Sequence, residues 1–389
     1  MKSYVFLCRS AAALAAAMVL SATPVSGQEK VKDINVALII PQSGPVMINV
    51  TPAVNSIKMA IEEANAKGIM INGEKHRFNV RWYDEECNPK VAINAARAAL
   101  DQVKPLHVVW AAMCSQTAVA IRPLLLEAKA VAINPTSGTS RFVGPKGEPY
   151  LFKTKEEFEW RTRDLVSYLK AKGYKKGAAI VVNSDWGSES VKVLQKYAAQ
   201  NNIELRTMRY DEHTEEFVPM LLQAREFRAD FIFQASQLLD EQVAFLRSYQ
   251  RLGLKIPLVG ESTWTEDVPA KSGWEAIDGM LTATAWLPSN PRPEVQAYLK
   301  KYVERFKAVP GFNGPGAYDL VHITARAFEK AGSLDTEALR KVLRTTVFEN
   351  TVYGDGTVKF DESGQAQFPV LVTAFDAKRK QRVVAPPAK

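Results

Sequence analysis

Hydroxyl-bearing side chains stand directly after three apolar segments in the first part of this 389-residue sequence. They are Ser43, Ser115, Thr117, Thr136, Ser137 and Thr139. If the apolar segments are parallel strands of one sheet, their carboxyl ends share the edge at which open α/β sheets bind ligands. Hydroxyls and the free N–H groups of a helix start suit an anion such as a carboxylate. For Ser115 and Thr117 the alternative is a purely structural N-cap.

The middle of the chain offers aromatic, amide and acidic side chains at comparable positions. Trp186 lies in the stretch SDWG, Gln234 begins QAS, and Glu261 begins ESTW. Aromatic and acidic groups are what a ligand with an apolar body and an ammonium group needs. A lone loop tryptophan more often only packs, so Trp186 and Trp264 indicate a ligand site mainly as a pair.

The sequence lacks the patterns of nucleophile, metal and cofactor chemistry. Its four histidines lie far apart without HExxH spacing, and CxxC, GxSxG and GxGxxG are absent. His213 lies near Glu215 and Glu216, in a stretch that we interpret as a solvated charged patch. We therefore predict a binding protein with no catalytic residues, no metal and no cofactor.

Residues 1–27 have the order of a secretory signal peptide. Lys2 and Arg9 precede the apolar stretch 11–20, and small residues then lead to Gly27. That stretch is short for a bilayer span, and an N-terminal anchor helix is the alternative. We predict an exported, periplasmic protein with cleavage near Gly27.

Export would place the cysteines in an oxidising compartment, and signal cleavage would lower the net charge. Two cysteines would remain, Cys87 and Cys114, which is the number one disulfide needs; two free buried thiols are the alternative. Loss of residues 1–27 lowers the formal charge from +8 to +6. The basic segment 378–382 is interpreted as a solvated tail, and no basic stripe alternates with aromatic residues, so no nucleic acid partner is expected.

Strand and helix patterns alternate from residue 34 to about residue 260. Strands are predicted at 34–40, 77–84, 106–111, 130–133, 150–154, 178–182, 203–210, 230–235 and 257–260. Helices are predicted at 53–67, 89–102, 116–129, from 157, and at 189–200, 217–227 and 239–252. This alternation predicts an α/β fold of doubly wound parallel sheets with two cores.

The last hundred residues break the alternation. Helices are predicted at 293–306, 318–331 and 336–344, and short strands near 357–360 and 370–375. Helices without core strands between them should complete the two lobes already formed, and a third lobe is not expected.

Several motifs, taken in order, resemble the type I periplasmic solute-binding proteins of ABC importers, especially the leucine/isoleucine/valine-binding group. The similar stretches are INVALIIPQSGPV from Ile34, NAKGI at 65–69, WYDEECNP at 82–89, AINPT at 132–136 and PGAYD at 315–319. The resemblance covers the chain from about Ile34 to its C-terminus. It implies two α/β lobes joined by three hinge crossings, with the ligand enclosed between them.

The resemblance also implies lobe boundaries and a disulfide. The N-terminal lobe would comprise 28–154 and 283–367, and the C-terminal lobe 155–282 and 368–389. The family has a disulfide where Cys87 and Cys114 stand, with Cys87 at the end of a strand that we place next to the strand before Cys114. This disulfide would fix the backbone before Ser115, so that the loop stays aimed at the cleft.

Ligand contacts can be carried over by position from this family. Ser115, Ser137 and Thr139 correspond to residues that bind the ligand α-carboxylate, and Trp186 replaces a common tyrosine. Glu261 is nearest to the acid that meets the ammonium group, with the register off by one. A second acid of the family aligns with Phe158. The predicted contacts are Ser43, Ser115, Thr117, Ser137, Thr139, Phe158, Trp186, Gln234 and Glu261.

The loss of an acid at Phe158 weakens the case for an ammonium-bearing ligand, because a buried charge needs a partner. The expected ligand is a branched-chain, hydrophobic or aromatic amino acid, and a non-amino-acid aromatic or hydrophobic carboxylate is the alternative. The expected partner is a membrane permease that receives the ligand from a monomeric binding protein. A sensory subunit of a membrane receptor and an exported hydrolase are the other hypotheses.

Overall fold

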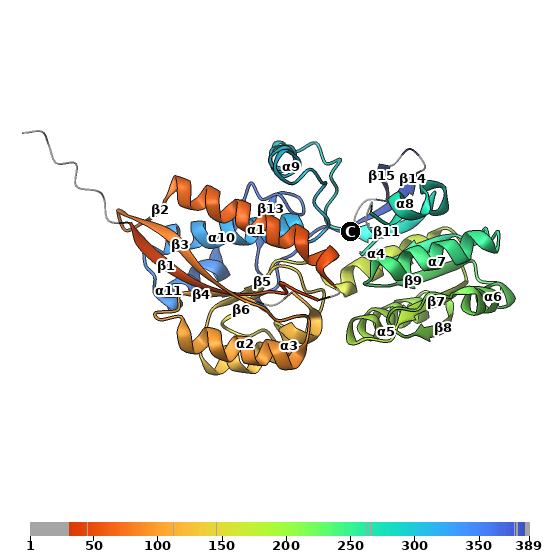
Figure 1. Cartoon of the computed structure of the whole chain (residues 1–389), viewed down its shortest axis with the longest axis horizontal. Helices are drawn as coiled ribbons and strands as arrows, with labels where there is room; N and C mark the ends of the chain where they lie inside the picture. The colour runs from red at the N-terminus through yellow and green to blue at the C-terminus, as the bar shows by residue number, and fades with distance from the viewer. Residues whose placement is uncertain are drawn as a thin grey trace, which may run out of the picture. The chain divides into compact units, whose positions relative to one another are not determined.

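The computed structural model describes residues 31–44, 46–111, 113–144, 146–261, 263–264, 267–376, 378 and 380–385. The predicted signal peptide and its cleavage site lie outside these residues, and so do Ser262 of the ESTW stretch and Arg379 of the basic segment. The part of the chain from Val31 onward forms one compact unit around two main sheets. Figure 1 shows both sheets with helices packed on their faces.

The first sheet has six strands in the order β2-β3-β1-β4-β5-β6. They are β1 (Lys32–Ile39), β2 (Ile69–Ile71), β3 (Glu74–Tyr83), β4 (Val108–Trp110), β5 (Ala132–Asn134) and β6 (Leu151–Lys153). Neighbours are parallel except β2 and β3, which form an antiparallel edge hairpin. The early helices of this lobe are α1 (Met47–Lys67), α2 (Pro89–Gln102) and α3 (Ser115–Glu127).

The alternating side chains of β1 explain the two helical layers of this lobe. Val36 and Leu38 belong to the core that also contains residues of α1 and α10 (Gly314–Ala331). Ala37 and Ile39 point to the opposite face, where their core contains alanines of α2 and residues of α3. Because successive strand residues face opposite sides, a strand buried on both faces reads as a continuous apolar run.

The second sheet has seven strands in the order β15-β14-β11-β10-β9-β7-β8. They are β7 (Lys176–Val182), β8 (Glu204–Tyr210), β9 (Phe231–Ala235), β10 (Leu258–Gly260), β11 (Leu281–Thr284), β14 (Leu371–Asp376) and β15 (Lys380–Ala385). The associated helices are α4 (Phe158–Ala171), α5 (Asp185–Gln200), α6 (Val218–Glu226), α7 (Leu239–Arg251), α8 (Asp267–Ser272) and the 3₁₀ helix η1 (Trp274–Ile277). The α/β prediction with parallel sheets is confirmed, although β14 and β15 add antiparallel pairs at one edge.

The last hundred residues return to the first lobe. They contribute α9 (Pro293–Phe306), α10, α11 (Thr336–Thr345) and a small hairpin of β12 (Val347–Glu349) and β13 (Thr357–Lys359). Tyr298, Leu320 and Leu339 of these helices pack in the core that contains Val36. We call the two assemblies the first lobe and the second lobe.

The predicted element limits need several corrections. The sequence patterns missed β2, β11, β12 and β15, which are short or lie at sheet edges. The segment interpreted as a solvated tail instead supplies β15, which pairs with β14. Helix α1 begins at Met47, six residues earlier than predicted, because the buried face continues through Val50 and Pro52 is tolerated inside the helix.

Helix α5 also begins earlier than predicted, at Asp185. The Ser184 hydroxyl accepts a hydrogen bond from the Gly187 N–H at 3.2 Å, as an N-cap residue does. Trp186 therefore lies in the first turn of a helix and not in a loop. This placement holds its indole at the end of the second lobe that faces the first.

Candidate ligand-binding site

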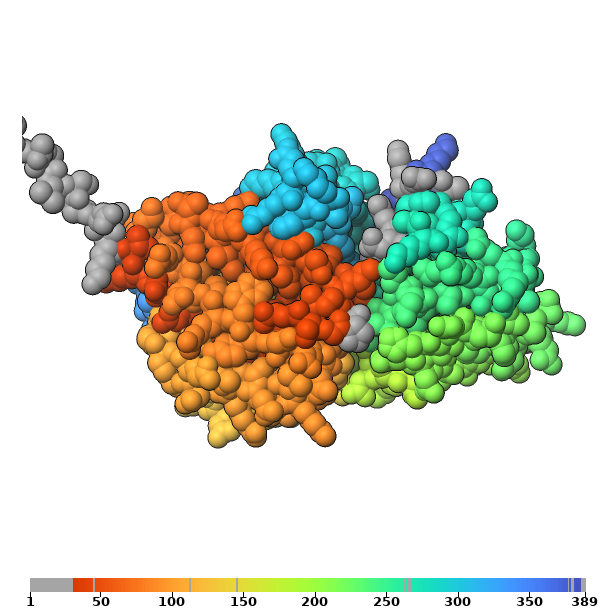
Figure 2. All heavy atoms as spheres, in the orientation of Figure 1, coloured from red at the N-terminus to blue at the C-terminus, as the bar shows by residue number. Residues whose placement is uncertain are grey.

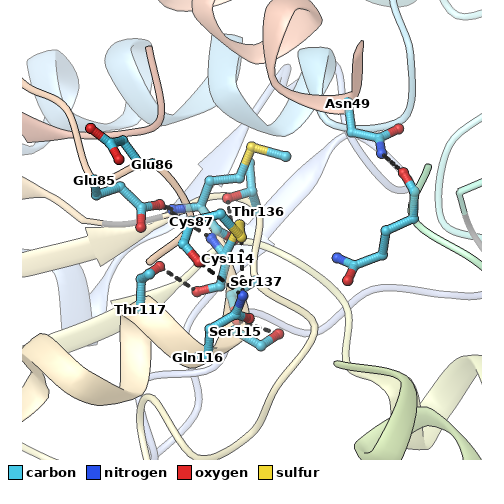
Figure 3. Close-up of a disulfide and its surroundings, with 12 residues drawn as sticks. Asn49, Glu85, Glu86, Cys87, Cys114, Ser115, Gln116, Thr117, Thr136 and Ser137 are labelled. Carbon is cyan, nitrogen blue, oxygen red and sulfur yellow. Dashed lines mark hydrogen bonds between the residues drawn. A yellow bond between two sulfur atoms is a disulfide. The ribbon is translucent and has the colours of Figure 1, made fainter. Parts of the chain in front are cut away.

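The Cys87–Cys114 disulfide is present, with a Cα–Cα distance of 5.5 Å, so the alternative of two free thiols is wrong. One sequence expectation needs correction, because the strands that precede the two cysteines are not neighbours. Strand β1 lies between β3 and β4, and the disulfide therefore ties together loops on either side of the carboxyl end of β1. Figure 3 shows the disulfide close to Ser115 and Ser137.

The buried carboxylate of Glu85 also holds the loop that precedes Ser115. Glu85 is fully buried, and its Oε1 accepts hydrogen bonds from the N–H groups of Met113 at 3.1 Å and Cys114 at 3.5 Å. Burial raises the pKa of Glu85 to about 7, although hydrogen bonds from the N–H groups of Met113 and Cys114 act in the opposite direction. The loop before Ser115 is thus held by one covalent bond and one buried acid.

Ser115 and Ser137 come together as predicted for strand ends at one sheet edge. Ser137 Oγ donates to Ser115 Oγ at 3.3 Å, and both side chains are buried. The N–H groups of Thr136 and Ser137 donate to Asn134 Oδ1 at 3.1 and 2.8 Å, which shapes the loop after β5. Ser115 is the first residue of α3, so its hydroxyl lies at a helix start.

Three of the predicted hydroxyl contacts have protein partners elsewhere. Thr117 is fully buried and donates to the Cys114 carbonyl at 2.9 Å, and Ser43 is exposed and donates to Asp84 Oδ2 at 2.7 Å. Thr139 Oγ1 donates to Glu189 Oε1 of α5 at 2.7 Å, which joins the first lobe to the second. The structure therefore places Thr117 and Ser43 away from the cavity described below, and Thr139 beside it in a contact between the lobes.

Two aromatic residues of the second lobe face this edge. Trp186 and Phe158 pack edge to face with ring centroids 5.8 Å apart. Gly138, between the two first-lobe hydroxyls Ser137 and Thr139, lies against Phe158, and a Cβ there would come within 3.1 Å of the ring. The close approach of this loop to the second lobe therefore depends on the absence of a side chain at residue 138.

The two polar residues predicted from the second lobe are occupied by protein partners. Gln234 is fully buried, where its Oε1 accepts from Trp264 Nε1 at 3.1 Å and its Nε2 donates to the Tyr210 hydroxyl at 3.3 Å. Glu261 accepts hydrogen bonds from Arg161 at 2.9 and 3.2 Å. The acid predicted to meet a ligand ammonium group is thus paired with a buried guanidinium. Each of these buried charges serves as the partner that the other needs.

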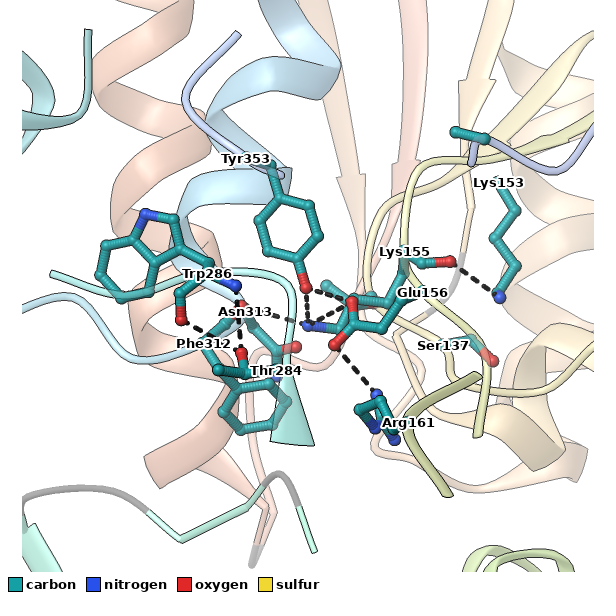
Figure 4. A network of polar contacts seen from close by, with 12 residues as sticks. Ser137, Lys153, Lys155, Glu156, Arg161, Thr284, Trp286, Phe312, Asn313 and Tyr353 are labelled. Atoms are coloured by element: carbon teal, nitrogen blue, oxygen red, sulfur yellow. Dashed lines mark hydrogen bonds and ion pairs between the residues drawn. The ribbon is translucent and has the colours of Figure 1, made fainter. Parts of the chain in front are cut away.

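A charged network at the junction of the lobes was not predicted (Figure 4). Arg161 bridges Glu261 and Glu156, the second at 3.1 Å, and Lys155 lies 3.4 Å from Glu156. Lys155 Nζ donates to the Tyr353 hydroxyl at 2.7 Å and lies 4.7 Å from the Phe312 ring, and the same hydroxyl donates to Glu156.

The electrostatics of this network follow from its burial. Burial lowers the pKa of Lys155 to about 8, although Glu156 favours the charged form. Burial by itself would raise the pKa of Glu156, but Lys155 and Arg161 outweigh it and lower that pKa to about 2. Lys155 and Glu156 directly follow β6, so the strand-end rule that selected the hydroxyls would also have selected them.

A small cavity of about 40 Å³ lies where these groups meet. Its lining residues are Asn49, Met113, Cys114, Ser115, Thr136, Ser137, Gly138, Lys155, Arg161, Trp186, Gln237, Thr263, Phe312 and Asn313. Among the described residues, the lining contains two cationic side chains and no carboxylate. A volume of this size holds about one water molecule. A larger ligand therefore requires the lobes to separate.

Direct contacts keep the lobes together around this cavity. Asn49 Nδ2 donates to the Gln237 carbonyl at 2.7 Å, in addition to the bond from Thr139 to Glu189. Figure 2 shows the red-orange start of α1, which contains Asn49, against the green surface of the second lobe. Each is a hydrogen bond that an opening motion can break and water can replace.

The described residues offer neither a metal site nor a membrane-spanning helix. Within them, no group of three or more His, Cys, Asp and Glu side chains could hold a metal ion. In the same part of the chain, no helix is long and apolar enough to span a membrane.

Comparison with known proteins gives consistent results. The sequence model of a family described as "Periplasmic binding protein" matches residues 33–380. A leucine-, isoleucine-, valine-, threonine- and alanine-binding protein of Pseudomonas aeruginosa is 24% identical over 356 residues, covering 90% of this chain and 92% of that protein.

Solved structures share the fold at lower identity. The leucine-binding protein LivK of Thermotoga maritima has a TM-score of 0.80 at 20% identity, covering 91% of this chain and 98% of its own. A solute-binding protein of an ABC transporter from R. palustris, solved with benzoate, has a TM-score of 0.81 at 18% identity. The match covers 92% of this chain and 97% of that one. LivJ of Streptococcus pneumoniae, solved with isoleucine, has a TM-score of 0.79 at 18% identity. The match covers 92% of this chain and 99% of that one.

Proposed function

We propose that this chain, which belongs to the periplasmic binding protein family, is the exported solute-binding component of an ABC importer. It would capture a small carboxylate between its two lobes and deliver it to a membrane permease as a monomer. The order of residues 1–27 supports export, with a signal peptide cleaved near Gly27. Its role would be binding without catalysis.

The observation that carries the proposal is the composition of the cavity between the lobes. The first lobe supplies the hydroxyls of Ser115 and Ser137 at a helix start, and Lys155 and Arg161 supply two buried cations. Hydroxyl donors, helix N–H groups and cations all stabilise a carboxylate. Trp186 adds an apolar wall for the remainder of the ligand.

The arrangement of the cores supports a clamshell with three hinge crossings. Core membership changes from the first lobe to the second between Phe152 and Phe158, back again between Ala283 and Ala285, and once more between Phe368 and Val370. We propose these positions as the hinges. They lie within a few residues of the lobe boundaries 154/155, 282/283 and 367/368 expected from the sequence.

We further propose that the ligand is a carboxylate without an ammonium group. An amino acid needs an acid for its ammonium group, whereas the described residues that line the cavity include no carboxylate and Glu261 is paired with Arg161. A solved relative holds benzoate, and another holds isoleucine, so the family accommodates both chemistries. The lining presents the cations Lys155 and Arg161 to a ligand while their carboxylate partners Glu156 and Glu261 lie behind it, which favours benzoate-like acids over isoleucine for this chain.

Calorimetric titration of the purified mature protein with benzoate and with isoleucine tests the proposal. We expect benzoate to bind and isoleucine to bind at least about tenfold more weakly, because its ammonium group would be buried unpaired. Ser115→Ala should weaken benzoate binding about tenfold, since a hydrogen bond to a charged group is lost. Ser140→Ala is the matched control, because Ser140 is exposed on the loop after Ser137.

The possible outcomes test the transport role and the class of ligand separately. Tight binding of isoleucine with no binding of benzoate would show that the ligand is an amino acid and leave the transport role intact. No binding of either acid, or equal effects of the two serine substitutions, would contradict the assignment of this cavity as the ligand site.

A further inference from the structure

A large open groove lies next to the small cavity. Its volume is about 860 Å³, against about 40 Å³ for the cavity. Ligand pockets usually measure about 300–1,000 Å³, so the groove and not the cavity has the size of an organic ligand. The groove is lined by residues of both lobes, including Pro52 and Phe306 of the first and Ala283 and Phe375 of the second.

The groove and the cavity share walls. Asn49 and Phe312 line both spaces, and the consecutive residues Thr263 and Trp264 line one each. Phe312 also ties the two together electrostatically, because Lys155 Nζ lies over its ring and donates to its carbonyl at 3.3 Å. Figure 4 shows Phe312 together with Trp286 of the groove and with Lys155 of the cavity. Asn49 and Phe312 therefore form a partition between two chambers of one cleft.

The chemistry of the groove complements that of the cavity. Six of its lining residues are Trp264, Trp274, Trp286, Phe306, Phe312 and Phe375. Among the described residues that line it, there is one cation, Lys307, and no carboxylate. Apolar and aromatic walls with few polar groups are typical of a site for an apolar body.

Two buried polar atoms of residues that line the two chambers have no hydrogen-bond partner among the described residues. They are Asn313 Oδ1, which belongs to the cavity, and Trp286 Nε1, which belongs to the groove. Both side chains are at least nine-tenths buried, with 3% and 5% exposed. An unpaired buried polar atom costs free energy that a ligand or a water molecule can recover.

We infer that the cleft binds an elongated amphipathic acid, with its carboxylate in the cavity and its apolar chain in the groove, past a displaced Phe312 side chain. This inference rests on the proposed function and specifies its ligand class as arylalkanoates and similar long-chain acids. It assigns Phe312 as the residue that divides short ligands from long ones. Short acids such as benzoate would occupy only the cavity side, enlarged by separation of the lobes.

Calorimetric titration with benzoate, 3-phenylpropanoate and 5-phenylpentanoate tests this inference. Affinity should increase along the series, and 5-phenylpentanoate should bind at least about tenfold more tightly than benzoate, because each fully buried CH₂ contributes up to about fourfold. Ala308→Trp should abolish this gain and leave benzoate binding within about twofold, because Ala308 is exposed and lines only the groove. Val303→Trp is the matched control on exposed α9 surface outside both chambers.

The results test the groove as a subsite separately from the binding of a carboxylate in the cavity. Benzoate binding without any dependence on chain length, or a length dependence that Ala308→Trp leaves unchanged, would overturn the groove as a subsite while the carboxylate-binding proposal stands. Absence of binding for all three acids would overturn the inference together with the proposed ligand chemistry.

Discussion

The two sides of the cavity offer different kinds of groups to the proposed carboxylate. The first-lobe edge uses neutral groups, the hydroxyls of Ser115 and Ser137 and a helix start, which cost little to bury once hydrogen-bonded. The opposite side uses full charges, with Lys155 and Arg161 buried beside Glu156 and Glu261. Buried ion pairs add little net stability but leave a large penalty when one partner is removed.

This difference predicts that the two sides fail differently when mutated. Loss of a hydroxyl should weaken binding and leave the fold intact. Loss of a charge should damage the fold before binding can be measured. The predictions below test that contrast, in order of decreasing expected effect.

Arg161→Met should give the largest effect. It leaves Glu156 and Glu261 buried without their shared cation, and we expect the free energy of unfolding to fall by about 3–5 kcal/mol. Urea denaturation measures this loss. Arg251→Met is the control, because Arg251 and its partner Glu216 are 60% and 56% exposed and the expected loss is under about 1 kcal/mol. Equal losses in the two variants would remove the distinction between the buried network and an ordinary surface pair.

Removal of the disulfide should come next. Replacing Cys87 and Cys114 together by serine removes a cross-link between residues 27 apart and should lower the free energy of unfolding by about 3–4 kcal/mol in the chain-entropy model. The affinity for benzoate should also fall, because the loop before Ser115 loses its fixed position. Wild-type protein under reducing conditions is the comparison. Unchanged affinity would restrict the disulfide to a role in stability.

Glu85 should make the first-lobe edge sensitive to pH. Its pKa of about 7 in the folded protein lies above the ordinary value of 4.5, so the folded state holds a proton that the unfolded state releases between these values. Stability should therefore fall as pH rises from about 4.5 to about 7, by about 3 kcal/mol, and then stay constant. Glu85→Gln should flatten this part of the curve in urea denaturation from pH 5 to pH 8.

Other buried carboxyls make the comparison between variant and wild type essential. Burial also raises the pKa values of Glu157, Glu241 and Asp319, the last to about 6, so the wild-type curve sums several groups. Only the difference between the two curves belongs to Glu85. A variant curve parallel to that of the wild type would exclude Glu85 as a source of the pH dependence.

The sequence predicted the neutral side of the site better than the charged side. Ser115 and Ser137 were found because they follow apolar strands, and this position is visible in a linear pattern. The partnership of Arg161 with Glu261 was not predictable, because it joins residues 100 apart that meet only when α4 packs near the end of β10. Gln234 and Thr117 satisfied the same strand-end pattern, but their side chains found partners within their own lobes.

The helices and strands of the fold were also predicted better where the signal is local than where it depends on distant residues. Residues 89–102 and 293–306 matched their helices to the residue, because proline at the first turn and helical spacing are local signals. The edge strands β2 and β15 were missed because their pairing depends on partners elsewhere in the sheet, and three residues or a basic sequence give little pattern.

The smallest expected effect concerns the contact that closes the lobes. Thr139 Oγ1 donates to Glu189 across the cleft and accepts from the backbone N–H and Nε of Arg141, so Thr139→Val removes one bond between the lobes and two within the first lobe. A single hydrogen bond contributes about 0.5–1.5 kcal/mol, so we expect the loss of the bond between the lobes to weaken benzoate affinity two- to tenfold. Small-angle scattering without ligand should show a larger radius of gyration for the variant. Thr214→Val, whose hydroxyl bonds only within its own turn, should leave both quantities unchanged, and an equal response from it would mean that the Thr139 bond does not bias closure.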